Sequence, residues 1–232
     1  MKLVCLGDFL FVVLKTRVIC NINLKIQFMK NISKKISVLF LFITLSLLGF
    51  SQSIKEIKVG NQIWMAENLN VVNFSNGNPI PQAQSDEEWV KACEEGRPAW
   101  CYFYSEYNNH ENAEEEYGIL YNWYAVIDPR GLAPKGWHTP TLEEWVQLER
   151  HRQLEYSTGA RISSIGLRNQ KGGGRSKKGT FFYCYRWWTK TECKYKDCSG
   201  QAYSRELSET ASDTHYNSMD KCFGFQVRCV KN

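Results

Sequence analysis

The chain has 232 residues and a formal net charge of +5, from 29 Lys and Arg against 24 Asp and Glu. Residues 1–51 hold six lysines, one arginine and one aspartate, so the formal charge of the remainder is −1. No basic cluster of the kind that nucleic-acid binding needs stands out in that remainder. We therefore expect no nucleic-acid partner.

Residues 29–51 have the layout of a secretory signal peptide. Basic Lys30, Lys34 and Lys35 precede an apolar run over 36–50, and small residues follow it, with cleavage expected before Gln52. The apolar run of about fifteen residues is short for a membrane span, which needs ~20. We expect a secreted, periplasmic or cell-surface protein. The alternative is an uncleaved anchor, and this segment would then be the protein's membrane contact.

Residues 1–28 form a second, poorer hydrophobic stretch, interrupted by Asp8, Lys15 and Arg17. Because Met29 begins a complete signal on its own, we interpret Met29 as the start and 1–28 as an upstream extension outside the mature protein. A membrane hairpin made by the two stretches is the alternative.

The remaining ~180 residues are enough for one domain with a sizeable core. All eight Trp and all twelve Tyr lie there, together with seven of the nine Cys. In an exported chain, cysteines indicate disulfides, here at most three with one thiol left over. The spacing does not fix which cysteines pair.

The first half of this domain contains clear sequence signals for individual strands, loops and helices. The pattern predicts a β-hairpin that turns at Gly60-Asn61, a loop over 73–83 and a strand over 100–104. A capping box from Ser85 to Glu88 predicts a short helix.

The second half continues with an exposed loop over 105–116, which lacks the spacing of a calcium loop, and a core helix over 118–127. A second capping box, Thr141 to Glu144, predicts another helix. The glycine-rich loop 171–179 lacks a phosphate-binding signature. Strands are predicted over 181–188, 201–207 and 223–230. Helices framed by strands indicate an α+β domain whose terminal strands meet in one sheet.

Four blocks carry a family resemblance, residues 59–69, 117–126, 130–145 and 224–230. In this order they resemble the Fibrobacter succinogenes major paralogous domain, which would span 54–231. That family looks like a branch of the C-type-lectin-like fold, shared with formylglycine-generating enzymes. The resemblance implies a small twisted antiparallel sheet, two main helices and long irregular loops. It implies no particular activity.

The same resemblance bears on the cysteines. Formylglycine-generating enzymes bind copper through two cysteines separated by four residues, as Cys193 and Cys198 are here, and thiolates suit copper(I). In an oxidising compartment a local disulfide is the simpler expectation. Family members often carry cysteines at the positions of Cys101 and Cys229, so we predict that these two pair. A third bridge would join Cys184 to Cys222.

No catalytic residue, metal site or cofactor is predicted. His138 has no partner at catalytic spacing and is interpreted as a hydrogen-bonded structural histidine. Large rings can stack on sugars or anchor proteins, although alternation along a strand would bury about half of them. The predicted ligand-binding residues are Trp187, Trp188, Tyr195 and Tyr203.

The leading hypothesis is a non-catalytic interaction module that binds an extracellular glycan or protein. The alternatives are a copper oxidase using Cys193 and Cys198, and a structural component of the cell envelope.

Overall fold

The computed structural model describes residues 54–104, 117–157, 172–207 and 214–232, and near the start residues 27, 29, 30 and 32–34. The chain divides into two compact units, Met1–Ser53 and Ile54–Asn232. The six described residues of the first unit are helical and exposed. Within the described ranges, no helix is long and apolar enough to cross a membrane. The predicted signal peptide lies almost wholly outside these ranges, as does the predicted loop 105–116, and both stay predictions.

One sheet joins the two ends of the second unit. β1 (Glu56–Val59) and β2 (Gln62–Met65) form the predicted antiparallel hairpin, around Gly60 with φ of 57°. β11 (Val230–Lys231) pairs with β2, and β5 (Trp137–His138) pairs with β11. The strand order is β1-β2-β11-β5. The prediction that the terminal strands meet in one sheet is therefore confirmed.

A second sheet is built from the later part of the chain. β8 (Arg186–Glu192), β9 (Gln201–Leu207) and β10 (Thr214–Asp220) are antiparallel, with β9 in the middle. A short 3-10 turn, η2 (Lys196–Cys198), lies between β8 and β9. The mixture of small antiparallel sheets and helices confirms the α+β class.

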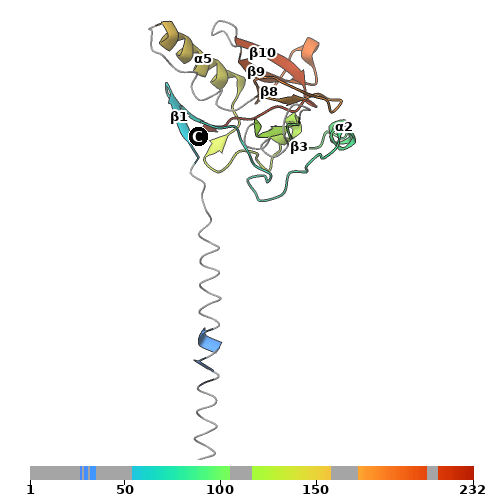
Figure 1. The fold of residues 1–232 in the computed structure, drawn as a ribbon. Coiled ribbons are helices and arrows are strands. Elements are labelled where there is room, and N and C mark those ends of the chain that lie inside the picture. Colours follow the sequence, from blue (N-terminus) through green and yellow to red (C-terminus); the bar gives the residue numbers. More distant parts are fainter. Residues whose placement is uncertain are drawn as a thin grey trace, which may run out of the picture. The chain divides into compact units, whose positions relative to one another are not determined.

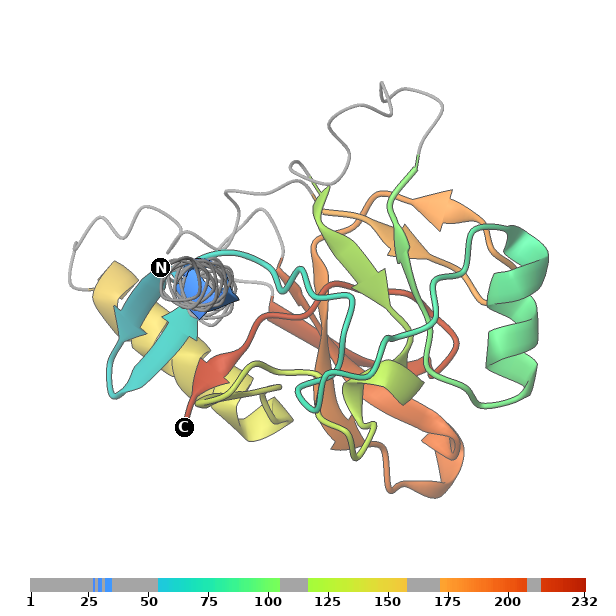
Figure 2. The ribbon, with the colours of Figure 1, turned by 90° about the horizontal axis from the view of Figure 1, so that it is seen from below.

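In the described part of this unit, two short ribbons and the helices α2, α4 and α5 accompany the two sheets. β3 pairs with β4, and β6 pairs with β7, both antiparallel. Figures 1 and 2 both show α2 and α5 at opposite sides of the unit, and α5 packs against β8 and β9. The bounds are β3 Trp100–Tyr102, β4 Ile119–Tyr121, β6 Gly174–Arg175, β7 Phe181–Phe182, α2 Asp86–Glu94, α4 Trp123–Val126 and α5 Leu142–Ser157.

Both long helices begin where their capping residues predicted. The Ser85 hydroxyl accepts a hydrogen bond from the Glu88 N–H at 3.2 Å, which caps α2. At the start of α5 two hydrogen bonds link the same two residues. The Thr141 hydroxyl accepts from the Glu144 N–H at 3.1 Å, and the Glu144 carboxylate accepts from the Thr141 N–H at 2.7 Å. These bonds satisfy backbone donors that a helix start leaves without partners.

The core helix predicted over 118–127 is wrong. The chain forms strand β4 and then the single turn of α4, which begins after Asn122. The side chain of Asn122 accepts from the Ala125 N–H at 3.1 Å and so starts the helix only there. Leu120 and Trp123 are both buried, but Ile127, assigned to the same face, is 44% exposed. The spacing of the apolar residues is that of a helix, but β4 is a strand because it pairs with β3.

The strand predicted over 223–230 is reduced to β11 at its end. Residues 224–230 are all buried, and successive residues bridge to different elements, Gly224 to Arg175, Phe225 to Tyr121 and Gln226 to Trp187. A segment that changes partner at each residue cannot form a ladder with any of them. The predicted strand 181–188 is likewise divided between β7 and β8, and β10 was not predicted because its sequence is mostly polar.

Candidate functional site

The two tryptophans predicted to bind ligand are core residues, so that prediction was wrong. Trp187 and Trp188 are both 0% exposed. The Trp187 indole N–H donates to Asn68 Oδ1 at 2.7 Å, and the Trp188 indole N–H donates to the Tyr121 carbonyl at 2.9 Å. Neither ring offers a face to a ligand.

The reason is that β8 is covered on both faces. Successive side chains of a strand point to opposite sides. Trp187 packs beside Trp145 of α5, with ring centroids 5.7 Å apart, while Trp188 packs on Phe225 at 4.9 Å. The alternation argument assumed one solvent-exposed face, and this strand has none at the two tryptophans.

Tyr195 and Tyr203 lie near the turn between β8 and β9. Tyr195 is 69% exposed, whereas Tyr203 is half-buried, with its hydroxyl 3.4 Å from the Cys193 sulfur. Their role in binding stays a prediction, and neither residue lines the cleft described below.

Two pairs of cysteines lie at disulfide distance. Cys193 pairs with Cys198, as predicted, and Cys93 pairs with Cys222. The other three described cysteines are unpaired thiols, so the predicted bridges from Cys101 to Cys229 and from Cys184 to Cys222 are absent. These thiols are Cys101, Cys184 and Cys229.

The observed pairing follows from packing. Cys93 lies on α2, and Trp89 of the same helix donates its indole N–H to the Cys222 carbonyl at 3.1 Å, which holds the two segments together. Cys101 packs in the hydrophobic cluster beneath α2, while Cys229 belongs to a different cluster. Burial raises the pKa of Cys101 to about 11 and that of Cys229 to about 12. Both thiols are therefore protonated at neutral pH.

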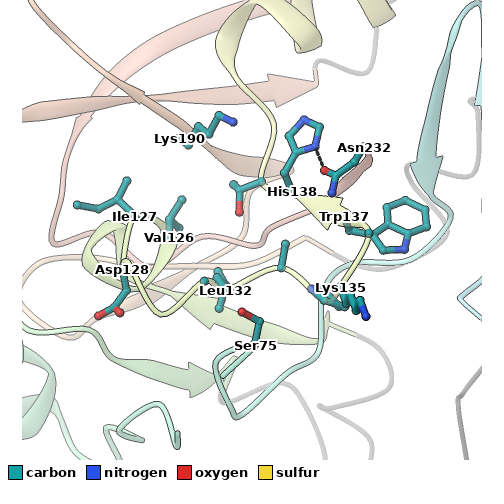
Figure 3. A pocket seen from close by; sticks show the side chains of 15 residues that line it. Ser75, Val126, Ile127, Asp128, Leu132, Lys135, Trp137, His138, Lys190 and Asn232 are labelled. Carbon is teal, nitrogen blue, oxygen red and sulfur yellow. Dashed lines mark hydrogen bonds between the residues drawn. The ribbon is translucent and has the colours of Figure 1, made fainter. Parts of the chain in front are cut away.

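A surface cleft of about 640 Å³ lies in the described part of the chain (Figure 3). Segments that are far apart in the sequence build it: the loop before β5, the end of α4, one residue of β8 and the residue after β11. Its lining residues are Ser75, Val126, Ile127, Asp128, Gly131, Leu132, Ala133, Pro134, Lys135, Gly136, Trp137, His138, Thr139, Lys190 and Asn232.

One wall of the cleft is held by Arg130 and Asp128. The Arg130 guanidinium donates to both carboxylate oxygens of Asp128, each at 2.8 Å, and lies 4.0 Å from the centre of the Phe74 ring. The Ser75 hydroxyl donates to the Arg130 carbonyl at 2.8 Å. Gly131, with φ of 80°, passes so close to Ser75 that an added Cβ would collide with it. These contacts fix the loop's path.

The opposite wall is organised by His138. Its Nε2 lies 2.7 Å from Glu144 Oε1, and its Nδ1 lies 2.7 Å from Asn232 Oδ1. His138 is thus hydrogen-bonded on both ring nitrogens, in agreement with the structural role expected from the sequence. Burial alone would raise the pKa of Glu144, but hydrogen bonds from Thr141 and His138 outweigh it and lower that pKa.

The charges around the cleft are unequal. Asp128 is the only Asp or Glu among the lining residues, and its pKa is lowered because Arg130 donates to it. Lys135 and Lys190 are exposed, and neither forms an ion pair with a carboxylate of the described residues. The cleft therefore presents two ammonium groups, while the one aspartate side chain that lines it is neutralised by a neighbouring guanidinium.

A model of the Fibrobacter succinogenes major domain matches residues 57–231. The chain belongs to this family. Nine of the fifteen residues that line the cleft, 131–139, lie within the family-like block 130–145 of this Fibrobacter succinogenes major domain. No curated protein and no solved structure matches the chain. Among the described residues, no three His, Cys, Asp or Glu side chains gather in a way that could hold a metal ion.

The cleft residues were missed at the sequence level. The glycines and prolines between Arg130 and Pro140 indicate a turn-rich loop, and such loops often carry binding residues. That signal points to Lys135 and Gly136. It does not reach Ser75, Lys190 or Asn232, which only tertiary folding brings to the same place.

Proposed function

We propose that this Fibrobacter succinogenes major domain is an exported, non-catalytic binding module that holds a glycan in the cleft. The observation that carries the proposal is the lining itself. Ile127, Ala133 and Pro134 supply accessible apolar surface, while Ser75 and Asn232 supply hydrogen-bonding groups at the rim. A sugar ring presents C–H faces and hydroxyls side by side, so it can use both kinds of surface.

The size of the cleft favours a small ligand over a protein surface. Small-molecule sites occupy roughly 300–1,000 Å³, and this cleft, at about 640 Å³, lies in that range. A stable protein partner would need roughly 800 Å² of contact on each side. A few sugar units fit the concave surface without further contacts.

Export is part of the proposal and is supported by the predicted signal over 29–51. The two cysteine pairs at disulfide distance are compatible with an oxidising compartment. We also propose that the fold is C-type-lectin-like. The sheet that joins both ends of the domain, the two long helices and the irregular stretches between them support that assignment.

A glycan array with matched tryptophan insertions tests the proposal. Ala133→Trp places a large ring inside the cleft, and Val72→Trp places the same ring at an exposed position that does not line it. We expect the unmodified protein to bind a subset of glycans, Ala133→Trp to lose that binding, and Val72→Trp to keep it.

Equal binding by both variants would place the ligand site elsewhere, and Tyr195 would become the next surface to test. No glycan binding by the unmodified protein, together with capture of a protein through the cleft, would replace the glycan by a protein partner. Thermal unfolding of each variant shows whether a lost signal reflects a lost fold.

A further inference from the structure

His138 and Asn232 meet at the rim of the cleft through a hydrogen bond whose direction depends on protonation. Nδ1 of His138 lies 2.7 Å from Oδ1 of Asn232, and Figure 3 shows this bond. A neutral imidazole carries one N–H, on either nitrogen, whereas the protonated ring carries two. The state of the ring therefore decides which of the two residues donates.

Glu144 determines which nitrogen of the neutral ring carries the proton. Its Oε1 lies 2.7 Å from Nε2 of His138. Burial would raise the pKa of Glu144, but hydrogen bonds from Thr141 and His138 lower it, so the carboxylate is ionised at neutral pH. An ionised carboxylate only accepts hydrogen bonds, so Nε2 must donate. In the neutral ring Nδ1 then has no proton and can only accept.

The amide of Asn232 can satisfy both states of the ring by turning about its last side-chain bond. The amide oxygen accepts, the nitrogen donates, and the two ends have nearly the same shape. Opposite the protonated ring the oxygen faces Nδ1, as in Figure 3. Opposite the neutral ring the nitrogen must face Nδ1, because two acceptors in contact would leave both unsatisfied.

The other end of the amide is available to a molecule in the cleft. Asn232 lines the cleft and is exposed. Within the described ranges its side chain forms a hydrogen bond only with His138. When the amide turns, the group that it presents to the cleft changes from a donor to an acceptor.

Charged groups on the neighbouring elements also act on His138. Carboxylates favour the protonated ring and ammonium groups disfavour it. They influence the pH at which the ring gains its second proton, whereas the hydrogen bond to Glu144 fixes which nitrogen donates in the neutral ring. These groups are Lys135 before β5, Lys190 on β8, Asp128 paired with Arg130, Lys231 paired with Glu56, and the main-chain carboxylate of Asn232.

We propose that Asn232 is a pH-dependent specificity residue of the cleft, which presents its amide oxygen to a bound glycan while His138 is neutral and its N–H groups when His138 is protonated. The proposal rests on the proposed function and deepens it, because it names a residue that selects among glycans. A sugar hydroxyl can donate to the oxygen or accept from the N–H groups. An O-methyl group can only accept, so it fits the protonated state alone.

NMR of the isotope-labelled protein without any glycan tests the hydrogen-bond arrangement. Histidine changes its charge between about pH 5 and 8, so spectra are compared at those two values. At about pH 8 we expect a proton on Nε2 only, and a coupling across the hydrogen bond between Nδ1 and the Asn232 amide nitrogen. At about pH 5 both ring nitrogens should carry protons and that coupling should be lost. A proton on Nδ1 only at about pH 8, or no such coupling at either pH, overturns the proposal.

Substitutions at the start of α5 test the role of Glu144. Glu144→Gln keeps an acceptor for the helix cap but can also donate, so the neutral ring should become a mixture of its two forms. Glu143→Gln is the matched control, because Glu143 lies in the same turn and is exposed, and it should keep the proton on Nε2. An unchanged ring in Glu144→Gln overturns the proposal.

Two changes at Asn232 test the amide itself. Asn232→Asp has no N–H to turn toward Nδ1, so both ring nitrogens should stay protonated to a higher pH, by about one unit or more. Two glycines added after Asn232 move the main-chain carboxylate away and should leave the proton of the neutral ring on Nε2. A proton that leaves Nε2 in the extended protein would show that the main-chain carboxylate fixes its place, which overturns the role given to Glu144.

A glycan array that includes O-methylated members tests the selection of ligands. Between about pH 8 and pH 5, binding of at least one methylated glycan relative to its unmethylated form should rise about threefold to tenfold. Asn232→Asp, which presents oxygen at both pH values, should show no such rise. An unchanged ratio in the unmodified protein, or an equal rise in Asn232→Asp, overturns the selection by Asn232. The glycan function survives either result if Ala133→Trp still abolishes binding.

Discussion

At the scale of single residues, Glu144 connects the α5 cap with the cleft. One of its carboxylate oxygens accepts from the Thr141 N–H, and the other lies 2.7 Å from His138 Nε2. His138 in turn meets Asn232, so a change at the helix start would reach the rim of the cleft through two hydrogen bonds. The position of the rim therefore depends on a group that does not line the cleft.

The lowered pKa of Glu144 predicts how its contribution depends on pH. Its ordinary pKa is 4.5, and the folded value lies below it, so the stabilisation is present above about pH 4.5 and is lost as pH falls through the folded value. We expect Glu144→Gln to lower the free energy of unfolding by about 1 kcal/mol at pH 7. Below the folded pKa the two proteins should converge.

Urea unfolding across pH measures this difference, with Glu143→Gln as the control. Glu143 is in the same first turn of α5 but is exposed. An equal loss in both variants, with the same dependence on pH, would show that Glu144 contributes only its charge near the helix end.

At the scale of elements, local signals determined some segments and tertiary contacts determined others. The helices starting after Ser85 and Thr141 were predictable because the capping side chains bind backbone groups within four residues. β4 was not, because Ile119–Tyr121 becomes a strand only by pairing with β3, and the residues of this segment alone do not indicate that pairing. The burial of Trp187 and Trp188 likewise depends on which elements cover β8, and a single strand's sequence does not contain that information.

The turn between β1 and β2 packs on α5 through Gly60. Its φ of 57° suits glycine, and an added Cβ would collide with the His151 ring. Gly77, with φ of 88°, has open space at the same position. We expect Gly77→Ala to cost about 1–2 kcal/mol from the backbone alone, and Gly60→Ala to cost about 1 kcal/mol more.

A double variant separates the two costs. In the His151→Ala background, Gly60→Ala should cost no more than Gly77→Ala, as measured by chemical unfolding. If the extra cost persisted without the His151 ring, the collision would not be its cause, and the packing of the hairpin on α5 would need another explanation.

At the scale of the whole molecule, the cleft needs four sections of chain, contributing Ser75, residues within 126–139, Lys190 and Asn232. The family block 130–145 indicated one of these four and could not indicate the others. Which cysteines pair was also only partly predictable from the sequence. Cys193 and Cys198 are close in sequence, and their pairing was predicted, whereas the pairing of Cys93 with Cys222 depends on where α2 docks.

The two bridges should stabilise the domain by unequal amounts, because they close loops of different length. Their sequence separations are 129 and 5 residues. In the chain-entropy model, a bridge over the longer loop is worth about 5 kcal/mol and one over the shorter loop about 2 kcal/mol. Replacing Cys93 and Cys222 together by Ala should therefore lower the free energy of unfolding by about 3 kcal/mol more than replacing Cys193 and Cys198.

Peptide mapping of the unreduced protein checks the pairing itself, and a cross-linked species joining Cys101 to Cys229 would contradict it. If the connectivity held but the two losses were equal, strain or residual structure in the unfolded chain would outweigh loop length.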